Sequence, residues 1–278
     1  MAAAASIADD GTERESRAKL YAIRIIAPVI VAVLVIGLWD LVVRINQIPP
    51  YILPGPLPVL KELVNGWPVL GPALLITLKI ACLALFAAIV GGVGLALLCS
   101  LSPLIEASLF PYAVVLQVTP VVSIAPLLLI YVDDTLTAVV LCAWIVAFFP
   151  VLSNTMLGLA SADHNLQNLF DLYGASRWQA LRHLRLPTAL PYFLGGLRIA
   201  GGLSLIGAVV AEYVAGTSGT GTGLAFRILE AGYRLNIPRM FAGLLLLALT
   251  GIAIYLLFTA LSWLLLHKWH ESALRREN

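Results

Sequence analysis

Residues 73–99 have the sequence ALLITLKIACLALFAAIVGGVGLALLC, a run in which Lys79 is the only charged residue. An α-helix rises 1.5 Å per residue, so a run of this length can cross the ~30 Å hydrocarbon core of a bilayer. The apolar residues follow one another without the period-2 alternation of a barrel strand. In lipid, such a segment satisfies its backbone hydrogen bonds only as a helix. The run therefore predicts a transmembrane helix.

Similar apolar runs recur along the chain, at residues 22–44, 106–131, 136–158, 190–215 and 240–266. The composition agrees, because 60% of the 278 residues are hydrophobic and only 12% are charged, with a mean hydropathy of +0.96. A soluble domain typically has about a quarter of its residues charged. We expect an all-α integral membrane protein with six transmembrane helices. The expected organisation is an N-terminal tail at 1–21, a transmembrane domain at 22–266 and a C-terminal tail at 267–278.

The charged residues predict the orientation of these helices. With six spans, both termini and the connection at 160–189 lie on one side. That side has the larger set of cations: Arg14, Arg17, Lys19, Arg24, Arg177, Arg182, Arg185, Lys268, Arg275 and Arg276. The opposite side has Arg44, Lys61, Arg227, Arg234 and Arg239. The positive-inside rule places the first side in the cytoplasm, and the net charge of +2 gives no indication of nucleic acid binding.

The third apolar run is predicted to be broken, because it contains Pro111, Pro120 and Pro126. A break inside the membrane is tolerated where the helix packs on protein or lines a wet cavity. Polar residues accompany the prolines, namely Gln117, Thr119 and Ser123. Either pathway lining or simple packing fits this pattern.

Charged residues also fall within the apolar runs, among them Lys79, Arg198 and Glu212. Lys79 and Arg198 are expected near span ends, where long side chains extend to the interface. Glu212 falls near the outer end of the fifth run, where a carboxylate is costly unless it is paired or wet. We therefore include Glu212 among the candidate pathway residues.

The connection at 160–189 has a different character, with the sequence DHNLQNLFDLYGASRWQALRHLRLP at 163–187. Leucine and aromatic residues at helical spacing predict a short amphipathic helix, and Gly174 provides a stop. Ser176 and Gln179 fit a capping box that begins a second helix, which Pro187 is expected to end. Such a helical pair could press into another protein. It could equally lie in the headgroup layer, with Trp178 and the arginines as anchors.

No catalytic or cofactor chemistry is indicated. The three cysteines lie apart within apolar runs, and no nucleophile–base pair or cluster of metal ligands is evident. The glycine-rich run at 216–223 lacks the lysine of a nucleotide-binding loop, so it predicts a flexible outer loop. We expect neither an enzyme, nor a cofactor, nor a metal site.

The connection also resembles that of a known family, the permease subunits of ATP-binding-cassette (ABC) importers. Their signature is Glu-Ala-Ala, three residues, a glycine and a later Leu-Pro. Here Gly174 stands in register with Leu186-Pro187 and Leu190-Pro191. The likeness continues through 196–200, 207–212 and the Leu53–Pro56 stretch, and is strongest to the branch serving nitrate, sulfonates, taurine and pyrimidine-type compounds. At the Glu-Ala-Ala position this chain departs from the family and has Asn168-Leu169-Phe170.

The resemblance implies a fold, partners and site residues. The fold is that of a type I importer permease, with a cytoplasmic coupling helix between the fourth and fifth spans. The partners are cytoplasmic ATPases, a second permease copy, an external solute-binding protein and membrane lipid, in a bacterial inner membrane. The residues implied in coupling are Asp171, Tyr173, Gly174, Ala175, Ser176, Arg177, Trp178 and Arg182. A secondary transporter or channel that needs no ATPase remains the alternative, and it would favour ionisable residues at mid-membrane and paired broken helices.

Overall fold

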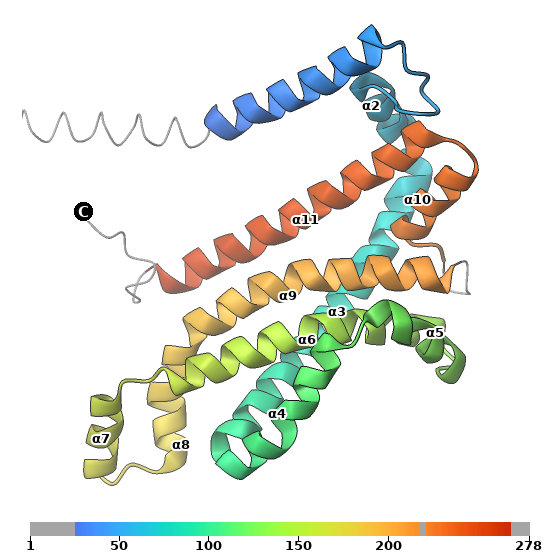
Figure 1. The fold of residues 1–278 in the computed structure, drawn as a ribbon. Coiled ribbons are helices and arrows are strands. Elements are labelled where there is room, and N and C mark those ends of the chain that lie inside the picture. Colours follow the sequence, from blue (N-terminus) through green and yellow to red (C-terminus); the bar gives the residue numbers. More distant parts are fainter. Residues whose placement is uncertain (1–25, 217–220, 268–278) are drawn as a thin grey trace, which may run out of the picture.

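The structure, a computed structural model, describes residues 26–216 and 221–267. The expected N-terminal tail, residues 268–278 of the expected C-terminal tail and residues 217–220 of the glycine-rich loop lie outside the described residues. Within the described ranges every regular element is helical. Figure 1 shows long helices that run between two ends of an elongated molecule. The predicted all-α class is confirmed.

Five helices are long and apolar enough to cross a membrane. They are Ile26–Ile45, α3 (Trp67–Leu101), α6 (Thr135–Ala160), α9 (Leu186–Ala215) and α11 (Ile237–Leu266). The third predicted span is instead a pair of helices, α4 (Pro103–Val118) and α5 (Val121–Tyr131), bent by 100°. If this pair counts as one broken span, the total is the predicted six. The break falls at Thr119–Pro120, while Pro111 and Pro126 lie inside the two helices.

The core is formed by α6 and α9, with α3 against both. Small residues let the backbones of α6 and α9 approach closely, as in other membrane helix pairs. A Cβ atom added to Gly158 would lie 2.8 Å from the Ala189 Cα atom, and one added to Gly207 would lie 2.7 Å from the Ala143 Cα atom. Larger side chains at these two glycines would therefore force the core apart.

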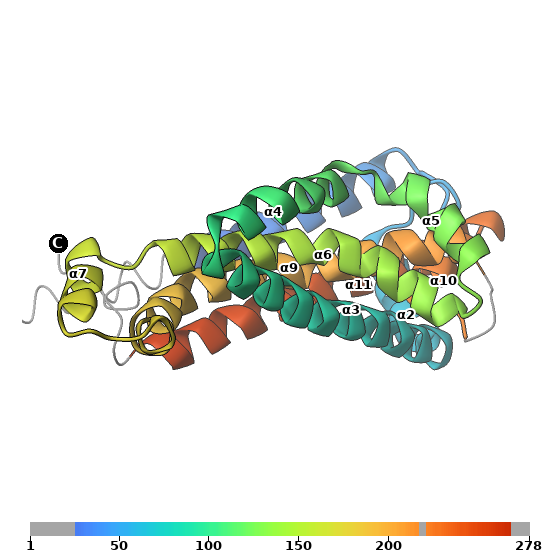
Figure 2. The same ribbon diagram turned by 90° about the horizontal axis from the view of Figure 1, so that it is seen from below.

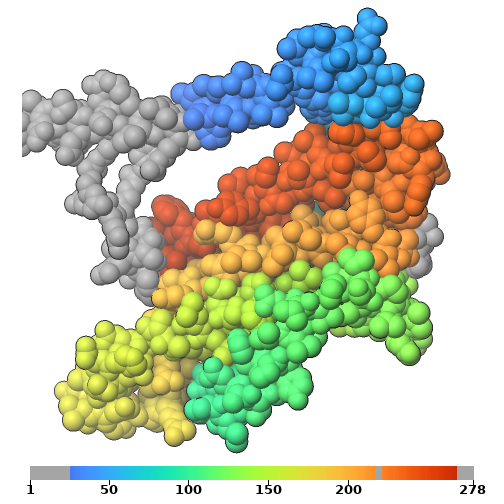
Figure 3. Space-filling model, in the orientation of Figure 1, coloured from blue at the N-terminus to red at the C-terminus, as the bar shows by residue number. Residues whose placement is uncertain are grey.

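The helix Ile26–Ile45 stands away from this core. None of its most apolar 18-residue window is buried, and Figure 3 shows it separated from α11 along much of its length. Its contact with the rest is near one end, where the rings of Trp39 and Phe241 lie 6.0 Å apart. The corresponding window of α11 is only 6% buried. Both helices thus present apolar surface outward.

Short helices lie at both ends of the molecule (Figure 2). At one end lie α7 (His164–Leu172) and α8 (Arg177–Ala180), and at the other lie α2 (Pro56–Asn65) and α10 (Leu224–Tyr233). We call these the α7/α8 end and the α10 end. From the sequence, no helix was predicted at residues 56–65 or 224–233. These two segments are helical because each buries an apolar face, as Val59 and Ile228 do in one shared cluster.

The two cations of the core helices differ in position. Lys79 lies close enough to Asp134 for its charge to help lower the pKa of that carboxyl, after the hydrogen bonds from Thr137. Lys79, the thirteenth residue of the 35-residue α3, therefore lies beside the first residues of α6 and not at an end of its own helix. The prediction for Arg198 was wrong, because α9 begins earlier than predicted and Arg198 lies near its middle. The guanidinium carbon of Arg198 is 5.6 Å from the centre of the Tyr255 ring.

Candidate functional site

The predicted helical pair at the α7/α8 end is present, and local hydrogen bonds define its first helix. An Asp163 side-chain oxygen caps α7 by accepting from the backbone N–H groups of Asn165 (2.6 Å) and Leu166 (3.3 Å). At the other end, Gly174 has a φ of +68°. The Ala175 N–H donates to Phe170 O (2.9 Å) and the Gly174 N–H to Asp171 O (3.0 Å). This pairing is a Schellman motif, so Gly174 ends α7 as predicted.

The second helix begins with the predicted capping box. The Gln179 N–H donates to the Ser176 Oγ atom (3.3 Å), and the Ser176 N–H donates to the Gln179 Oε1 atom (2.7 Å). The prediction that Pro187 ends this helix was wrong, because the chain stays helical from Arg177 to Ala215. A π-helical turn at Leu181–Arg185 precedes Pro187 and widens the helix where the proline cannot donate a hydrogen bond. Pro187 and Pro191 consequently lie inside one continuous helical stretch.

The α7–α8 hairpin (residues 163–185) projects from the core (Figure 1), and several of its apolar side chains are exposed. No residue of α7 is buried. The side chains of Leu172 and Tyr173 are each 82% exposed, and that of Trp178 is 66% exposed. Buried Leu181 and Leu184 anchor the base of the hairpin. An exposed apolar patch on a projecting element is typical of a surface that binds protein or lipid.

The predicted coupling residues fall into two groups. Asp171, Ala175, Arg177 and Trp178 line a common cavity of about 670 Å³ between the hairpin and the α3–α4 junction. The other predicted residues do not line it and lie on the exposed hairpin surface: Tyr173, Gly174, Ser176 and Arg182. Asn168, at the departure from the family signature, is also exposed, and the nearest carboxylate along the chain is that of Asp171.

Three of the predicted pathway residues lie together at the α4–α5 break. Gln117 is in the last turn of α4, Thr119 is the capping residue and Ser123 is in the first turn of α5. Gln117 and Ser123 are exposed, and the Thr119 hydroxyl donates to Val115 O (2.6 Å). The break therefore presents polar groups part-way along the bundle.

The fourth predicted pathway residue, Glu212, lies apart from these three and is 4% exposed. Its Oε1 atom accepts a hydrogen bond from the Thr77 hydroxyl (2.7 Å), and its Oε2 atom accepts one from the Ala225 N–H (3.0 Å). The Thr77 oxygen in turn accepts from the Leu224 N–H (2.9 Å). Hydrogen bonds to a charged group each contribute about 1.5–3 kcal/mol, which offsets part of the cost of burying the carboxylate. We call Glu212, Thr77 and the first turn of α10 the buried polar knot.

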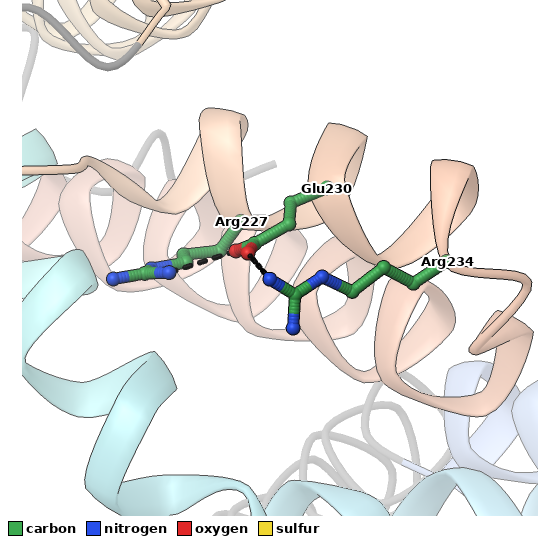
Figure 4. Close-up of polar contacts among 3 residues, drawn as sticks. All are labelled: Arg227, Glu230 and Arg234. Carbon is green, nitrogen blue, oxygen red and sulfur yellow. Dashed lines mark hydrogen bonds and ion pairs between the residues drawn. The ribbon is translucent and has the colours of Figure 1, made fainter.

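A group of charged side chains lies on α10 beyond this knot (Figure 4). The Glu230 carboxylate accepts from Arg227 (2.7 Å) and pairs with Arg234 (2.7 Å). The hydrogen bond from Arg227, together with the charges of Arg227, Arg234 and Arg239, lowers the pKa of Glu230 below its ordinary value. Arg239 also pairs with Glu62 (2.6 Å), which joins the start of α11 to α2. Sequence reasoning missed Thr77 and the Arg239–Glu62 pair because their partners are far apart in the chain, and it did not single out the short-range pairs of Glu230.

The residues that the structure describes contain no cluster of His, Cys, Asp or Glu that could hold a metal ion. The candidate functional features are an exposed apolar hairpin at one end, a broken helix pair within the bundle and the buried polar knot at the other end.

Comparison with known proteins identifies the family. Residues 88–267, more than half of the chain, match the family described as binding-protein-dependent transport system inner membrane component. The chain belongs to this family. It is thus an ABC transporter permease, a membrane subunit that is not itself an enzyme, since ATP hydrolysis occurs in a separate subunit. Membership implies ATPase and solute-binding partners.

Individual relatives agree with this assignment. The permease is 32% identical over 87% of its length to a probable ABC transporter permease protein of Haemophilus influenzae, of which it covers 96%. It is 31% identical over 84% of its length to the taurine transport system permease protein TauC of Escherichia coli, covering 85% of that protein. It is also 31% identical over 81% of its length to the formylaminopyrimidine transport permease protein ThiX of Halalkalibacterium halodurans, covering 88% of it.

Solved structures confirm the fold of the permease. It superposes on a chain of an amino acid ABC transporter crystallised with histidines with a TM-score of 0.59, at 20% identity, covering 74% of this chain and 96% of that one. On the MetNI methionine ABC transporter the TM-score is 0.60, at 19% identity, covering 70% and 94% of the two chains. The predicted type I importer permease fold is confirmed.

Proposed function

We propose that this permease forms the translocation pathway of an ATP-driven importer for a small polar solute in a bacterial inner membrane. The α7/α8 end and both termini face the cytoplasm, and the α10 end receives the solute from an external binding protein. The α7–α8 hairpin docks into a groove of the cytoplasmic ATPase. The observation that carries this proposal is the projecting hairpin, whose apolar tip is left uncovered by the residues that the structure describes.

The side chains of the hairpin suit such a docking. Gly174 and Ala175 offer little bulk, which permits close approach of a partner backbone. Exposed Arg177 and Arg182 can form charge-assisted hydrogen bonds with carboxylates of the groove. We assign the coupling role to the residues predicted from the sequence: Asp171, Tyr173, Gly174, Ala175, Ser176, Arg177, Trp178 and Arg182.

We also propose that two copies of the permease form the pathway. The outward apolar surfaces of the helix Ile26–Ile45 and of α11 support this, since they extend beyond what one chain covers. Membrane lipid covers the remainder. Within each copy, the polar groups at the α4–α5 break line the pathway: Gln117, Thr119 and Ser123.

The proposal limits the solute to a small polar compound. The relatives are named for taurine, formylaminopyrimidine, riboflavin and nitrate, so closely similar chains serve chemically different solutes. Hydroxyl and amide groups at the break suit weak contacts with many such compounds. Selection then rests with the binding protein.

The alternative is a secondary transporter that works without an ATPase. A mid-helix Arg198 and a broken α4–α5 pair are features of that class. The family, however, depends on a binding protein and an ATPase, and the exposed hairpin has no role in the alternative.

The test is gentle purification of the tagged chain from its native membranes, followed by identification of the associated proteins. We expect an ATPase subunit in the complex and solute uptake in vesicles that depends on ATP. A solute-binding protein recovered with it can be screened for its ligand. A chain that purifies without an ATPase and transports solute in ATP-free vesicles would contradict the proposal.

A further inference from the structure

We infer that Glu212 is a positioning residue. With Thr77, it holds the first turn of α10 against α9 and α3, and we call this function of the buried polar knot the clamp. As a result, the α10 end moves with the helix that carries the hairpin. This inference rests on the proposed coupling role of the hairpin. It gives Glu212 a role different from that of a pathway residue, which the sequence had suggested for it.

The first argument concerns the backbone of α10. The first N–H groups of a helix have no partner within the helix and require another acceptor. The residue before α10, Gly223, has no side chain to cap them. The Leu224 N–H donates instead to Thr77 of α3, and the Ala225 N–H donates to Glu212 of α9. Side chains from two transmembrane helices therefore cap α10.

The second argument concerns charge. A helix N-terminus has a partial positive charge, which stabilises a carboxylate placed against it. Both oxygens of Glu212 are occupied, one by the Thr77 hydroxyl and one by Ala225, and the residue is 4% exposed. A carboxylate that is almost fully buried and bonded in this way is poorly accessible to a passing solute.

The third argument concerns space. A Cβ atom added to Gly223 would lie 2.1 Å from the carboxyl carbon of Glu212. The φ of Gly223 is −72°, an ordinary value for any residue, so the absence of a side chain matters here and not the backbone conformation. The loop can therefore approach the Glu212 carboxylate closely only because residue 223 has no side chain.

The fourth argument concerns the connection between the ends. One continuous helix runs from Arg177, in the hairpin, to Ala215, and Glu212 lies in its last turn. The clamp joins that turn to α10, whose outward group of Arg227, Glu230 and Arg234 lies at the opposite end from the hairpin (Figures 1 and 4). A displacement of the hairpin is thereby passed to the surface on which the binding protein is proposed to dock.

The experiment compares clamp variants of the full-length chain in lipid nanodiscs, together with the ATPase that purifies with it. Thr77→Val removes the hydroxyl at nearly constant size, and Thr77→Ser retains it. Glu212→Gln places an amide N–H₂ where the carboxylate accepted two hydrogen bonds. Gly223→Ala inserts a methyl group into the clamp, and Gly202→Ala is its control on α9, because a Cβ atom at Gly202 meets nothing within 4 Å.

Two quantities are measured. The first is amide hydrogen exchange at Leu224 and Ala225, which we expect to become about tenfold faster in Thr77→Val, Glu212→Gln and Gly223→Ala. The second is ATPase activity, with and without the solute-binding protein recovered in the same purification. We expect these three variants to keep basal activity within about twofold and to lose most of the stimulation. Thr77→Ser and Gly202→Ala should match the unaltered chain in both measurements.

Either of two results overturns the inference. Unchanged exchange at both amides in Thr77→Val and Glu212→Gln would show that no clamp exists. Faster exchange with full stimulation would show that the clamp relays nothing. Exchange is measured on the permease alone as well, so a chain that recovers no ATPase would refute the proposed function while the clamp is still tested.

Discussion

The two ends of this permease are constructed by different means. At the α7/α8 end, every bond that shapes the hairpin joins residues at most five positions apart: the Asp163 cap, the Gly174 turn and the Ser176–Gln179 box. At the α10 end, three of the side-chain bonds join residues 135, 147 and 177 positions apart. The first end is locally specified and exposed, whereas the second is held by contacts between distant helices.

This difference matches the tasks proposed for the two ends. A surface that docks into a separate ATPase must keep its shape without support from the core, and local caps provide that. An end that must follow the movement of the membrane helices has to be attached to them, and buried hydrogen bonds provide that. The continuous helix Arg177–Ala215 joins the two. Variants at either end should therefore fail in different ways.

The largest effect is expected from Gly174→Trp. The backbone of Gly174 has a φ of +68°, where a side chain costs about 1–2 kcal/mol, and the indole adds bulk on the proposed docking face. We expect uptake to fall to the level of cells that lack the chain, while membrane insertion persists. Uptake and membrane fractionation measure the two.

The control for this variant is Gly174→Asn, since asparagine tolerates the same backbone conformation with a small side chain. It should retain most of the uptake. Normal uptake by Gly174→Trp would contradict the proposal that the α7–α8 hairpin docks into the ATPase.

A smaller loss is expected from Glu212→Gln at the other end. The amide can no longer accept from both Thr77 and Ala225, so the clamp loosens while the hairpin is untouched. We expect uptake to fall about tenfold, the factor that corresponds to 1.4 kcal/mol, with ATPase association unchanged in pull-down. Loss of ATPase association in this variant would contradict the proposal that the ATPase binds at the α7/α8 end and not at the α10 end.

A still smaller effect is expected from Ser176→Ala. Removal of a helix-capping hydroxyl costs about 1 kcal/mol. Because the capping box is exposed and local, the change should loosen α8 without disturbing the core. We expect uptake reduced by a few fold and an unchanged thermal unfolding temperature in detergent. A large drop in that temperature would show that the hairpin contributes to the core after all.

The smallest effect concerns pH at the α10 end. The pKa of Glu230 is lowered by its arginine neighbours, so the pairing stabilises the fold above the ordinary value of 4.5 and is lost as pH falls through the folded-state pKa. Glu230→Gln should lower the unfolding temperature slightly at pH 7, by less than about 1 kcal/mol in free energy for so exposed a pair. The difference should vanish in acid. A difference that grows in acid would contradict this account.

The contrast between the ends also explains which features the sequence could predict. The helical pair, the Gly174 stop and the capping box follow from short-range rules, and each was predicted and found. The α4–α5 break was likewise expected from its prolines. Thr77 could not be connected to Leu224 or Glu212, because no local pattern joins them. Helix α10 does show apolar residues at helical spacing, such as Leu224, Ile228 and Ala231, a signal that the preceding glycine-rich run obscured.

Two predictions failed because of tertiary context. Pro187 was expected to mark a helix end, but a π-helical turn and the packing of α9 on α6 keep the helix continuous. This extension also moved Arg198 from a predicted span end to the middle of α9. Local rules for proline apply to an isolated helix, whereas here packing against neighbouring helices keeps the helix continuous.

The most direct test of the account is site-specific photo-crosslinking in native membranes. A photoreactive residue replaces Leu172, which is 82% exposed on the hairpin, or Leu235, which is 72% exposed at the α10 end. We predict that an ATPase subunit is crosslinked from position 172 and not from position 235. An ATPase crosslinked only from position 235, or from neither position, would contradict the assignment of the α7–α8 hairpin as the coupling site.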